Sequence, residues 1–77
     1  MKRDKAGLIQ WIIGEECSKA RVAKDYSLTE FADLVGYTKA NVSVFEHGKN
    51  NNLYLLMCYV RYCDLDVKEV LLKCQLI

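Results

Sequence analysis

Apolar residues recur along most of the chain at the three- and four-residue spacing of an α-helix. The clearest stretch predicts a first helix from about residue 4 to residue 24, with apolar positions at Leu8, Ile12, Ile13, Cys17 and Ala20. The 77 residues include no proline and only four glycines, which argues against a turn-rich β-sandwich or barrel. The pattern therefore favours an all-α fold.

Residues 27–48 carry start and stop signals for two short helices. Ser27 and Glu30 form an S-x-x-E capping box, which predicts a second helix that ends at Gly36. Thr38 is the expected N-cap of a third helix, which Gly48 ends. The residues expected to face the core are Phe31, Ala32 and Leu34 in the second helix and Val42 and Phe45 in the third.

Two more helices are predicted in the last third of the chain. The polar run 49–52 places Asn52 as the N-cap of a fourth helix over about residues 53–63. Asp66 and Glu69 form a second capping box, which opens a fifth helix through Val67, Val70, Leu71 and Cys74. The prediction is five helices and no strands.

Length and composition limit the function classes. A chain of 77 residues with 52% hydrophobic residues and a net charge of +1 is expected to form one folded domain rather than a disordered chain. It has no arrangement of nucleophile, base and orienting group, so we expect no enzyme activity. The near-neutral balance means that any nucleic-acid binding needs a local positive surplus.

The four cysteines, Cys17, Cys58, Cys63 and Cys74, include no C-x-x-C pair, and His47 is the only histidine. We therefore expect neither a metal site nor a cofactor. The N-terminus lacks a signal-peptide pattern, and the longest apolar run, residues 53–60, is too short to span a membrane. These features predict a cytoplasmic protein with buried, reduced cysteines and no membrane partner.

Ala32, Gly36 and Val42 fit two short helices that cross closely, turn tightly and pack on each other. Around them, the segments 27–38 and 41–49 resemble the helix-turn-helix family of phage repressors and Cro, the XRE family. The Ile13-Gly14-Glu15 run and the apolar pattern of residues 53–70 extend the resemblance over about 65 residues. It implies a compact five-helix, lambda-repressor-like DNA-binding domain over residues 1–77. Its helix-turn-helix core lies at about 27–47, and residues 1–12 are an N-terminal extension of the first helix.

The resemblance implies that the third helix lies in the DNA major groove, where Lys39, Ala40, Asn41, Ser43 and Val44 would face the bases. Lysine can donate to guanine or to phosphate, and asparagine can pair with adenine or instead take a phosphate. The side chains of alanine and valine offer only apolar contact with a thymine methyl. The other DNA-facing positions that it implies are Ser27, Leu28, Thr38, Lys49, Asn50 and Asn52.

Several of these positions have their own expected roles. The backbone N–H groups at Ser27-Leu28 and at Asn52-Leu53 are expected to clamp phosphates. Lys39 and Lys49 are the first candidates for phosphate contacts from side chains, and Arg21 and Lys24 are further candidates. Glu46 is expected to accept hydrogen bonds inside the fold rather than to act as a catalytic acid. The chain departs from the family at Leu28, where a glutamine is common, and at Val44, where a longer polar side chain is common.

The fourth helix is apolar on all sides, with Arg61 as its one charged residue. Its expected core positions are Leu53, Leu56, Met57, Tyr59, Val60 and Cys63. That leaves Tyr54, Leu55, Cys58 and Tyr62 on the outer face. A helix that is apolar all round needs a second cover, which we interpret as a dimer interface in preference to coverage by residues 1–12.

Two functions stay open from the sequence. The first is a homodimeric, sequence-specific transcriptional regulator, a small repressor that places its third helices in successive major grooves of a near-palindromic double-stranded DNA site. The second is a protein-interaction module on the same fold, which modulates another regulator without strong DNA binding of its own. Neither function needs a small-molecule ligand.

Overall fold

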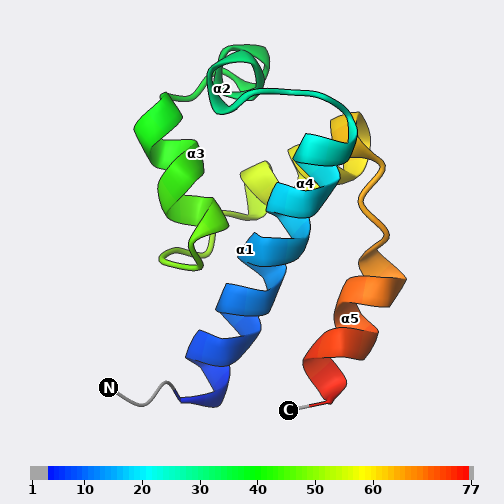
Figure 1. The fold of residues 1–77 in the computed structure, drawn as a ribbon. Helices are drawn as coiled ribbons and strands as arrows, with labels where there is room; N and C mark the ends of the chain where they lie inside the picture. The colour runs from blue at the N-terminus through cyan, green and yellow to red at the C-terminus, as the bar shows by residue number, and fades with distance from the viewer. Residues whose placement is uncertain (1–3, 77) are drawn as a thin grey trace.

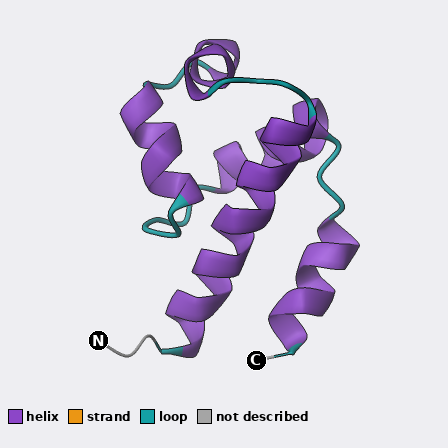
Figure 2. Ribbon diagram, viewed as in Figure 1, coloured by secondary structure: helices purple, strands orange, loops and turns teal. Residues whose placement is uncertain are grey.

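The computed structural model of the chain describes residues 4–76. Over these residues the chain forms five α-helices and no strands: α1 (Lys5–Ala23), α2 (Leu28–Val35), α3 (Lys39–Glu46), α4 (Leu53–Cys63) and α5 (Val67–Gln75). Figure 1 shows their arrangement and Figure 2 shows that short loops join them. The predicted all-α fold with five helices is confirmed, and the helices lie where the start and stop signals predicted them. Residues 1–3 of the expected N-terminal extension lie outside the described residues.

A polar side chain caps the N-terminus of every described helix, which explains why the boundaries follow the sequence closely. The capping residues are Asp4, Ser27, Thr38, Asn52 and Asp66, and each accepts a hydrogen bond from the backbone N–H three residues later. At Ser27 the capping box is complete, because the Glu30 side chain also accepts from the Ser27 N–H at 2.9 Å. At Asp66 only the aspartate half of the predicted box forms.

Helix α1 is the centre of the arrangement and packs against α3, α4 and α5, while α2 packs against α3 (Figure 1). Gly14 lets α1 approach the end of α3. A Cβ atom there would lie 2.6 Å from the Glu46 carbonyl oxygen and 2.8 Å from that of Phe45. Gly36, with φ +78°, provides the left-handed residue at which α2 ends, so only three residues separate α2 from α3.

The core is built around the aromatic ring of Tyr59 in α4. The ring centroid of Tyr59 lies 4.5 Å from that of Phe31 in α2 and 5.7 Å from that of Phe45 in α3. Helices α2, α3 and α4 therefore meet at one aromatic side chain. The other buried apolar residues are Cys17, Ala32, Val35, Val42, Leu55, Cys58, Cys63, Leu65 and Val70.

The prediction that Leu34 faces the core is wrong. Leu34 is 43% exposed, and Val35 is buried in its place. Phe31, Ala32 and Val35 share one side of α2, because a step of four residues brings Val35 back over Phe31. Leu34 lies beside that stripe and faces outward.

The predicted orientation of α4 is partly wrong. Tyr59 and Cys63 are buried as predicted, but four other positions differ. Leu53 and Met57, expected in the core, are 73% and 57% exposed, whereas Leu55 and Cys58, expected on the outer face, are 0% and 6% exposed. A helix with apolar residues on all sides has no stripe that identifies its inner face. The packing of neighbouring helices decides the orientation instead.

In α5, Val70 is buried and Cys74 half-buried, while Val67 and Leu71 of the same predicted apolar set are exposed.

No helix among residues 4–76 combines the length and the hydropathy that a membrane span requires.

Candidate nucleic-acid interface

Helix α3 has two clearly different sides. Val42 and Phe45, at 0% and 4% exposure, hold it against the core, as predicted. The side chains of Lys39, Ala40 and Asn41 and part of the Val44 side chain point to solvent. With only eight residues, this helix is too short to be stable alone, so its buried side fixes how its exposed side is presented.

Glu46, the last residue of α3, joins the helix to its neighbours. Its carboxylate accepts from Arg21 Nε at 2.8 Å, from a second guanidinium nitrogen of Arg21 at 3.1 Å, and from the Tyr59 hydroxyl at 2.5 Å. Arg21 also donates to the Tyr26 carbonyl at 2.6 Å. The expected role of Glu46 as an internal acceptor is confirmed.

The same junction fixes the ionisation of its members. The hydrogen bond to Glu46 raises the pKa of the Arg21 guanidinium, and burial is the main cause of the raised pKa of Tyr59. The guanidinium therefore stays charged and the phenol stays protonated, as their hydrogen bonds to Glu46 require. The junction (Arg21, Glu46 and Tyr59) is a fixed ion-pair and hydrogen-bond network between α1, α3 and α4.

This network removes Arg21 from the predicted phosphate contacts. Its side chain is only 10% exposed, and each of its three guanidinium nitrogens already donates a hydrogen bond, because α1 turns it inward toward Glu46. Lys24 is exposed but lies 2.6 Å from an Asp64 carboxylate oxygen. The C-terminal end of α1 therefore offers little positive charge that is not already paired.

Lys39 and Lys49 differ from these two residues. Both are exposed, and within residues 4–76 neither forms an ion pair. The one acid between Gly36 and Leu53 is Glu46, whose charge Arg21 already balances. The outward side of α3 and the loop after it therefore carry a local surplus of positive charge, which the net charge of the whole chain conceals.

The helix N-termini predicted to clamp phosphate are not equivalent. The Ser27 N–H at the start of α2 is already bonded to Glu30, so it does not provide the expected free donor. The pKa of Glu30 is lowered by its hydrogen bonds from Ser27, so a negative charge stays at this terminus. Leu28 is half-buried and packs against the core.

The N-termini of α3 and α4 have no acidic residue in the first turn. At α4, Asn52 accepts from the Leu55 N–H at 3.0 Å and donates to the Tyr37 hydroxyl at 3.0 Å, which holds its side chain in place. At α3, the Thr38 hydroxyl accepts from the Asn41 N–H at 3.1 Å and keeps its own proton for a second acceptor. The N-terminus of α4 therefore matches the phosphate-clamp expectation better than that of α2 does, and the N-terminus of α3, for which no clamp was predicted, is equally free of acidic side chains in its first turn.

His47 has an orientation that the sequence analysis did not predict. Its Nδ1 lies 2.7 Å from the carbonyl oxygen of Ser43, which can only accept, so Nδ1 is the protonated nitrogen. The Ser43 hydroxyl lies 3.5 Å from the same nitrogen, and Ser43 is half-buried. The spacing of four residues between serine and histidine on a helix was the available signal.

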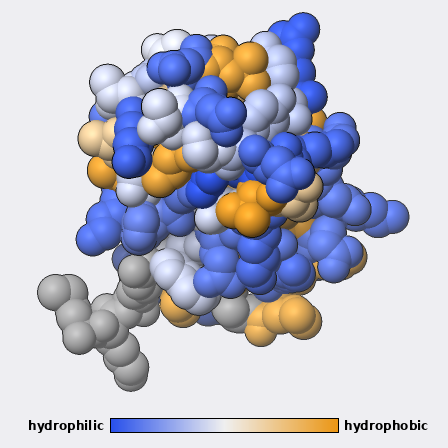
Figure 3. All heavy atoms as spheres, turned by 45° about the horizontal axis from the view of Figure 1, so that its top comes forward, coloured by the Kyte–Doolittle hydropathy of each residue, from blue (hydrophilic) through white to orange (hydrophobic). Residues whose placement is uncertain are grey.

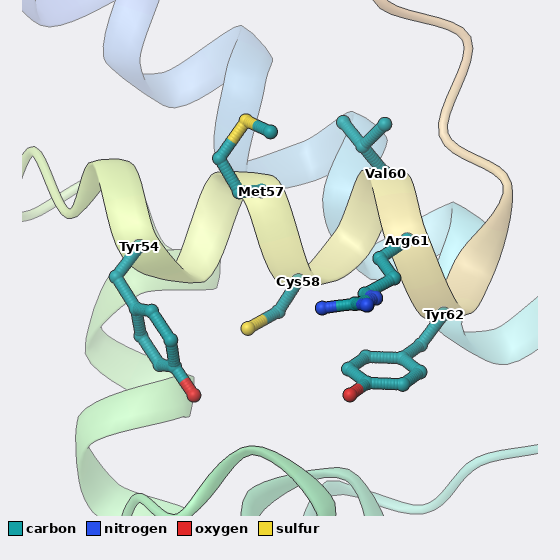
Figure 4. Close-up of a pocket in the computed structure, with 6 residues that line it drawn as sticks. All are labelled: Tyr54, Met57, Cys58, Val60, Arg61 and Tyr62. Carbon is teal, nitrogen blue, oxygen red and sulfur yellow. The ribbon is translucent and has the colours of Figure 1, made fainter.

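The outer face of α4 differs from the predicted dimer interface. Figure 4 shows Tyr54, Cys58 and Tyr62 on one side of the helix, with Met57 and Val60 on the other. Cys58 is buried, and Tyr54 donates from its hydroxyl to the Val35 carbonyl at 2.8 Å, so this side is turned toward α2. A hollow of about 420 Å³ lies between these side chains.

The four cysteines are free thiols, and three of them are buried. Burial raises the pKa of Cys17 to about 12 and that of Cys63 to about 11, so both remain protonated near neutral pH. Among residues 4–76, no group of three or more potential ligands could hold a metal ion.

The structure thus brings Thr38, Lys39, Ala40, Asn41 and Val44 together on one exposed helix, with Lys49 and Asn50 exposed in the loop that follows. It turns Leu28, Leu55 and Cys58 partly or wholly into the core. Figure 3 turns the α2 end of the molecule forward; hydrophilic side chains dominate that face, and hydrophobic ones form separate patches.

Comparison with protein-family models, curated proteins and solved structures finds no match to this chain.

Proposed function

We propose that the protein is a sequence-specific DNA-binding transcriptional regulator of the helix-turn-helix type. In this proposal α2 and α3 form the motif, and α3 enters the major groove with its N-terminal residues toward the base edges. The protein would act in the cytoplasm as a small repressor. The observation that carries the proposal is the outward side of α3, which is exposed, free of acidic side chains and followed by a second unpaired lysine, Lys49.

The support comes from how charges and donors are distributed. Lys39 and Lys49 stand at the two ends of α3 without carboxylate partners in the described residues. The N-termini of α3 and α4 add backbone donors with no acid beside them. Phosphate contacts from these groups would position the helix, and Lys39 and Asn41 would supply polar contacts to bases.

We further propose that the protein binds as a homodimer on a near-palindromic site. One subunit offers two lysines in and just after α3, Lys39 and Lys49, that form no ion pair within residues 4–76. Two subunits together would offer about four such cationic contacts, enough for a log–log salt slope of about −3 to −4. The exposed residues Tyr54 and Tyr62 of α4, together with Leu53 and Met57, are candidates for the contact between subunits.

Selection from random duplexes at low salt is the experiment that tests this function. We expect an enriched near-palindrome whose half-sites lie roughly 10 base pairs apart, and a salt slope of about −3 to −4 for the selected duplex. Because each phosphate contact contributes about 0.9 to the slope, Lys39→Ala plus Lys49→Ala should remove most of it.

The matched control is Lys5→Ala plus Lys68→Ala, which removes the same charge from exposed lysines in α1 and α5. It should leave most of the slope in place. No enriched sequence, or an equal loss of slope in the two double variants, would overturn the assignment of DNA binding to α3.

A protein-interaction module remains the second candidate, because α4 exposes large apolar side chains beside a hollow. Leu53, Tyr54 and Met57 are each more than half exposed, at 73%, 53% and 57%. Apolar side chains that cluster on a surface are typical of protein contacts. Failure to shift any duplex at low salt, together with stable binding to a second protein, would favour this function.

A further inference from the structure

We infer that α3 discriminates between bases mainly through the C5-methyl groups of pyrimidines, thymine above all, which Val44 and Ala40 contact. The inference rests on the proposed function, because it names the feature of DNA that the same helix would recognise. It assigns specificity to two apolar side chains rather than to the polar ones beside them.

The position of the two side chains is the first step. Ala40 and Val44 are four residues apart in α3, so they lie one above the other on the same side of the helix. Ala40 is exposed and Val44 is 41% exposed, while Val42 and Phe45 fill the core from the opposite side. A small apolar ridge therefore runs along the outward side of α3.

The chemistry of the major groove supplies the second step. Base pairs show hydrogen-bond donors and acceptors there, and the thymine methyl is the one apolar group among them. Valine and alanine side chains have no polar atom, so they gain nothing from an N7, an O6 or an amino group. A duplex that places polar groups against this ridge would lose their hydration without a compensating hydrogen bond.

Rigidity is the third step. A valine in a helix has one strongly preferred rotamer, so Val44 loses little conformational freedom when a methyl group packs against it. Two polar side chains nearby, those of Lys39 and Ser43, are less suited to a fixed contact with a base. Lys39 is long and flexible, and the hydroxyl of half-buried Ser43 lies close to the His47 ring at 3.5 Å.

The test uses the selected duplex with single thymines replaced by deoxyuridine, which removes only the methyl group and keeps the base pair. At the contacted thymine we expect binding to weaken about fourfold, and about 15-fold when both half-sites are changed. These factors follow from the usual free energy of burying one methyl group. At every other thymine the affinity should stay unchanged.

A double-mutant cycle assigns the contact to Val44. Val44→Ala should bind the thymine duplex more weakly than wild type and should lose much less on replacement by deoxyuridine. The control variant is Val67→Ala in α5, because both valines are 41% exposed. It should keep the full effect of the methyl group, and circular dichroism should show that both variants are folded.

A second arm uses cytosine and 5-methylcytosine at the contacted position. The methylated base should bind more tightly by a similar factor, because the pair is constant and only the methyl group differs. The inference is overturned if a selected duplex tolerates deoxyuridine at every thymine, or if wild type and Val44→Ala lose affinity equally; DNA binding by α3 would then still stand. If no duplex is selected, both the inference and the proposed function fail.

Discussion

The two sides of α3 show how one eight-residue helix is divided between side chains that support the fold and side chains that face solvent. On the inner side, Glu46 is 6% exposed and bound to Arg21 and Tyr59. On the outer side, Lys39 and Asn41 are exposed and make no side-chain hydrogen bond within the described part of the chain. The inner side holds the helix in place, so the outer side can leave its polar groups free for a ligand.

Two basic residues of one small domain can have different roles, depending on whether an acidic side chain is paired with them. Arg21 and Lys39 are both basic and both close to the motif in sequence. Arg21 is held by Glu46 and contributes to the fold, whereas Lys39 has no such acceptor. A net charge of +1 therefore describes neither side.

Removing Glu46, the acid on the inner side of α3, is expected to have the largest effect on stability. We expect Glu46→Ala to lower the free energy of unfolding by about 3–5 kcal/mol, because it leaves the Arg21 guanidinium buried without a partner. For a domain whose total stability is about 5–15 kcal/mol, that loss is large. Urea denaturation followed by circular dichroism measures it.

Its control is Glu15→Ala, which removes a glutamate paired with Lys19 at the surface, where the glutamate side chain is 42% exposed. That change should cost less than about 1 kcal/mol. Equal losses in the free energy of unfolding from the two variants would mean that the junction stabilises the fold no more than a surface ion pair does.

The second largest loss of stability is expected from a substitution that forces α1 away from α3 and changes no charge. Gly14→Ala places a methyl group within 2.6 Å of a backbone oxygen of Glu46, which cannot rotate away. We expect a net loss of about 1–3 kcal/mol, even though alanine favours a helix over glycine by about 1 kcal/mol.

Ser18→Ala in the same helix serves as the control for helix propensity, and it should be neutral or slightly stabilising. Thermal unfolding of both variants gives the comparison. A Gly14→Ala variant that is as stable as wild type would contradict the close approach of α1 to α3.

The smallest effect on stability is expected on the outer side. Asn41→Ala should change the free energy of unfolding by no more than about 0.5 kcal/mol, because its exposed side chain makes no hydrogen bond within residues 4–76. The same variant should weaken binding to the selected duplex by less than about fourfold, because the methyl contacts of Ala40 and Val44 are inferred to carry most of the discrimination. A marked loss of stability would show that the outer side also supports the fold.

Much of the fold follows from local signals in the sequence. The capping residues Ser27, Thr38 and Asn52 and the left-handed Gly36 act within a few residues of themselves, so their hydrogen bonds and backbone angles are predictable without tertiary contacts. The candidate site followed in part, because Val42 and Phe45 mark the inner side of α3 and leave Lys39 and Asn41 outside.

The errors have a common physical cause. Leu34, Leu55, Cys58 and Arg21 were each assigned to the wrong environment because their placement depends on other helices. In α4 the apolar residues surround the helix, so the pattern is compatible with several rotations. The bond from Tyr59 to Glu46 and the packing of Tyr59 on Phe31 favour one of them.

The sequence by itself therefore determined the number, limits and order of the helices, because caps, turns and periodicity act over a few residues. Only the tertiary structure decided which side of α4 is buried and that Arg21 belongs to Glu46. It also decided that Lys39 and Lys49 form no ion pair within residues 4–76. Those outcomes depend on which side chains meet across 13 to 25 residues of chain, as the bonds of Glu46 to Tyr59 and Arg21 do.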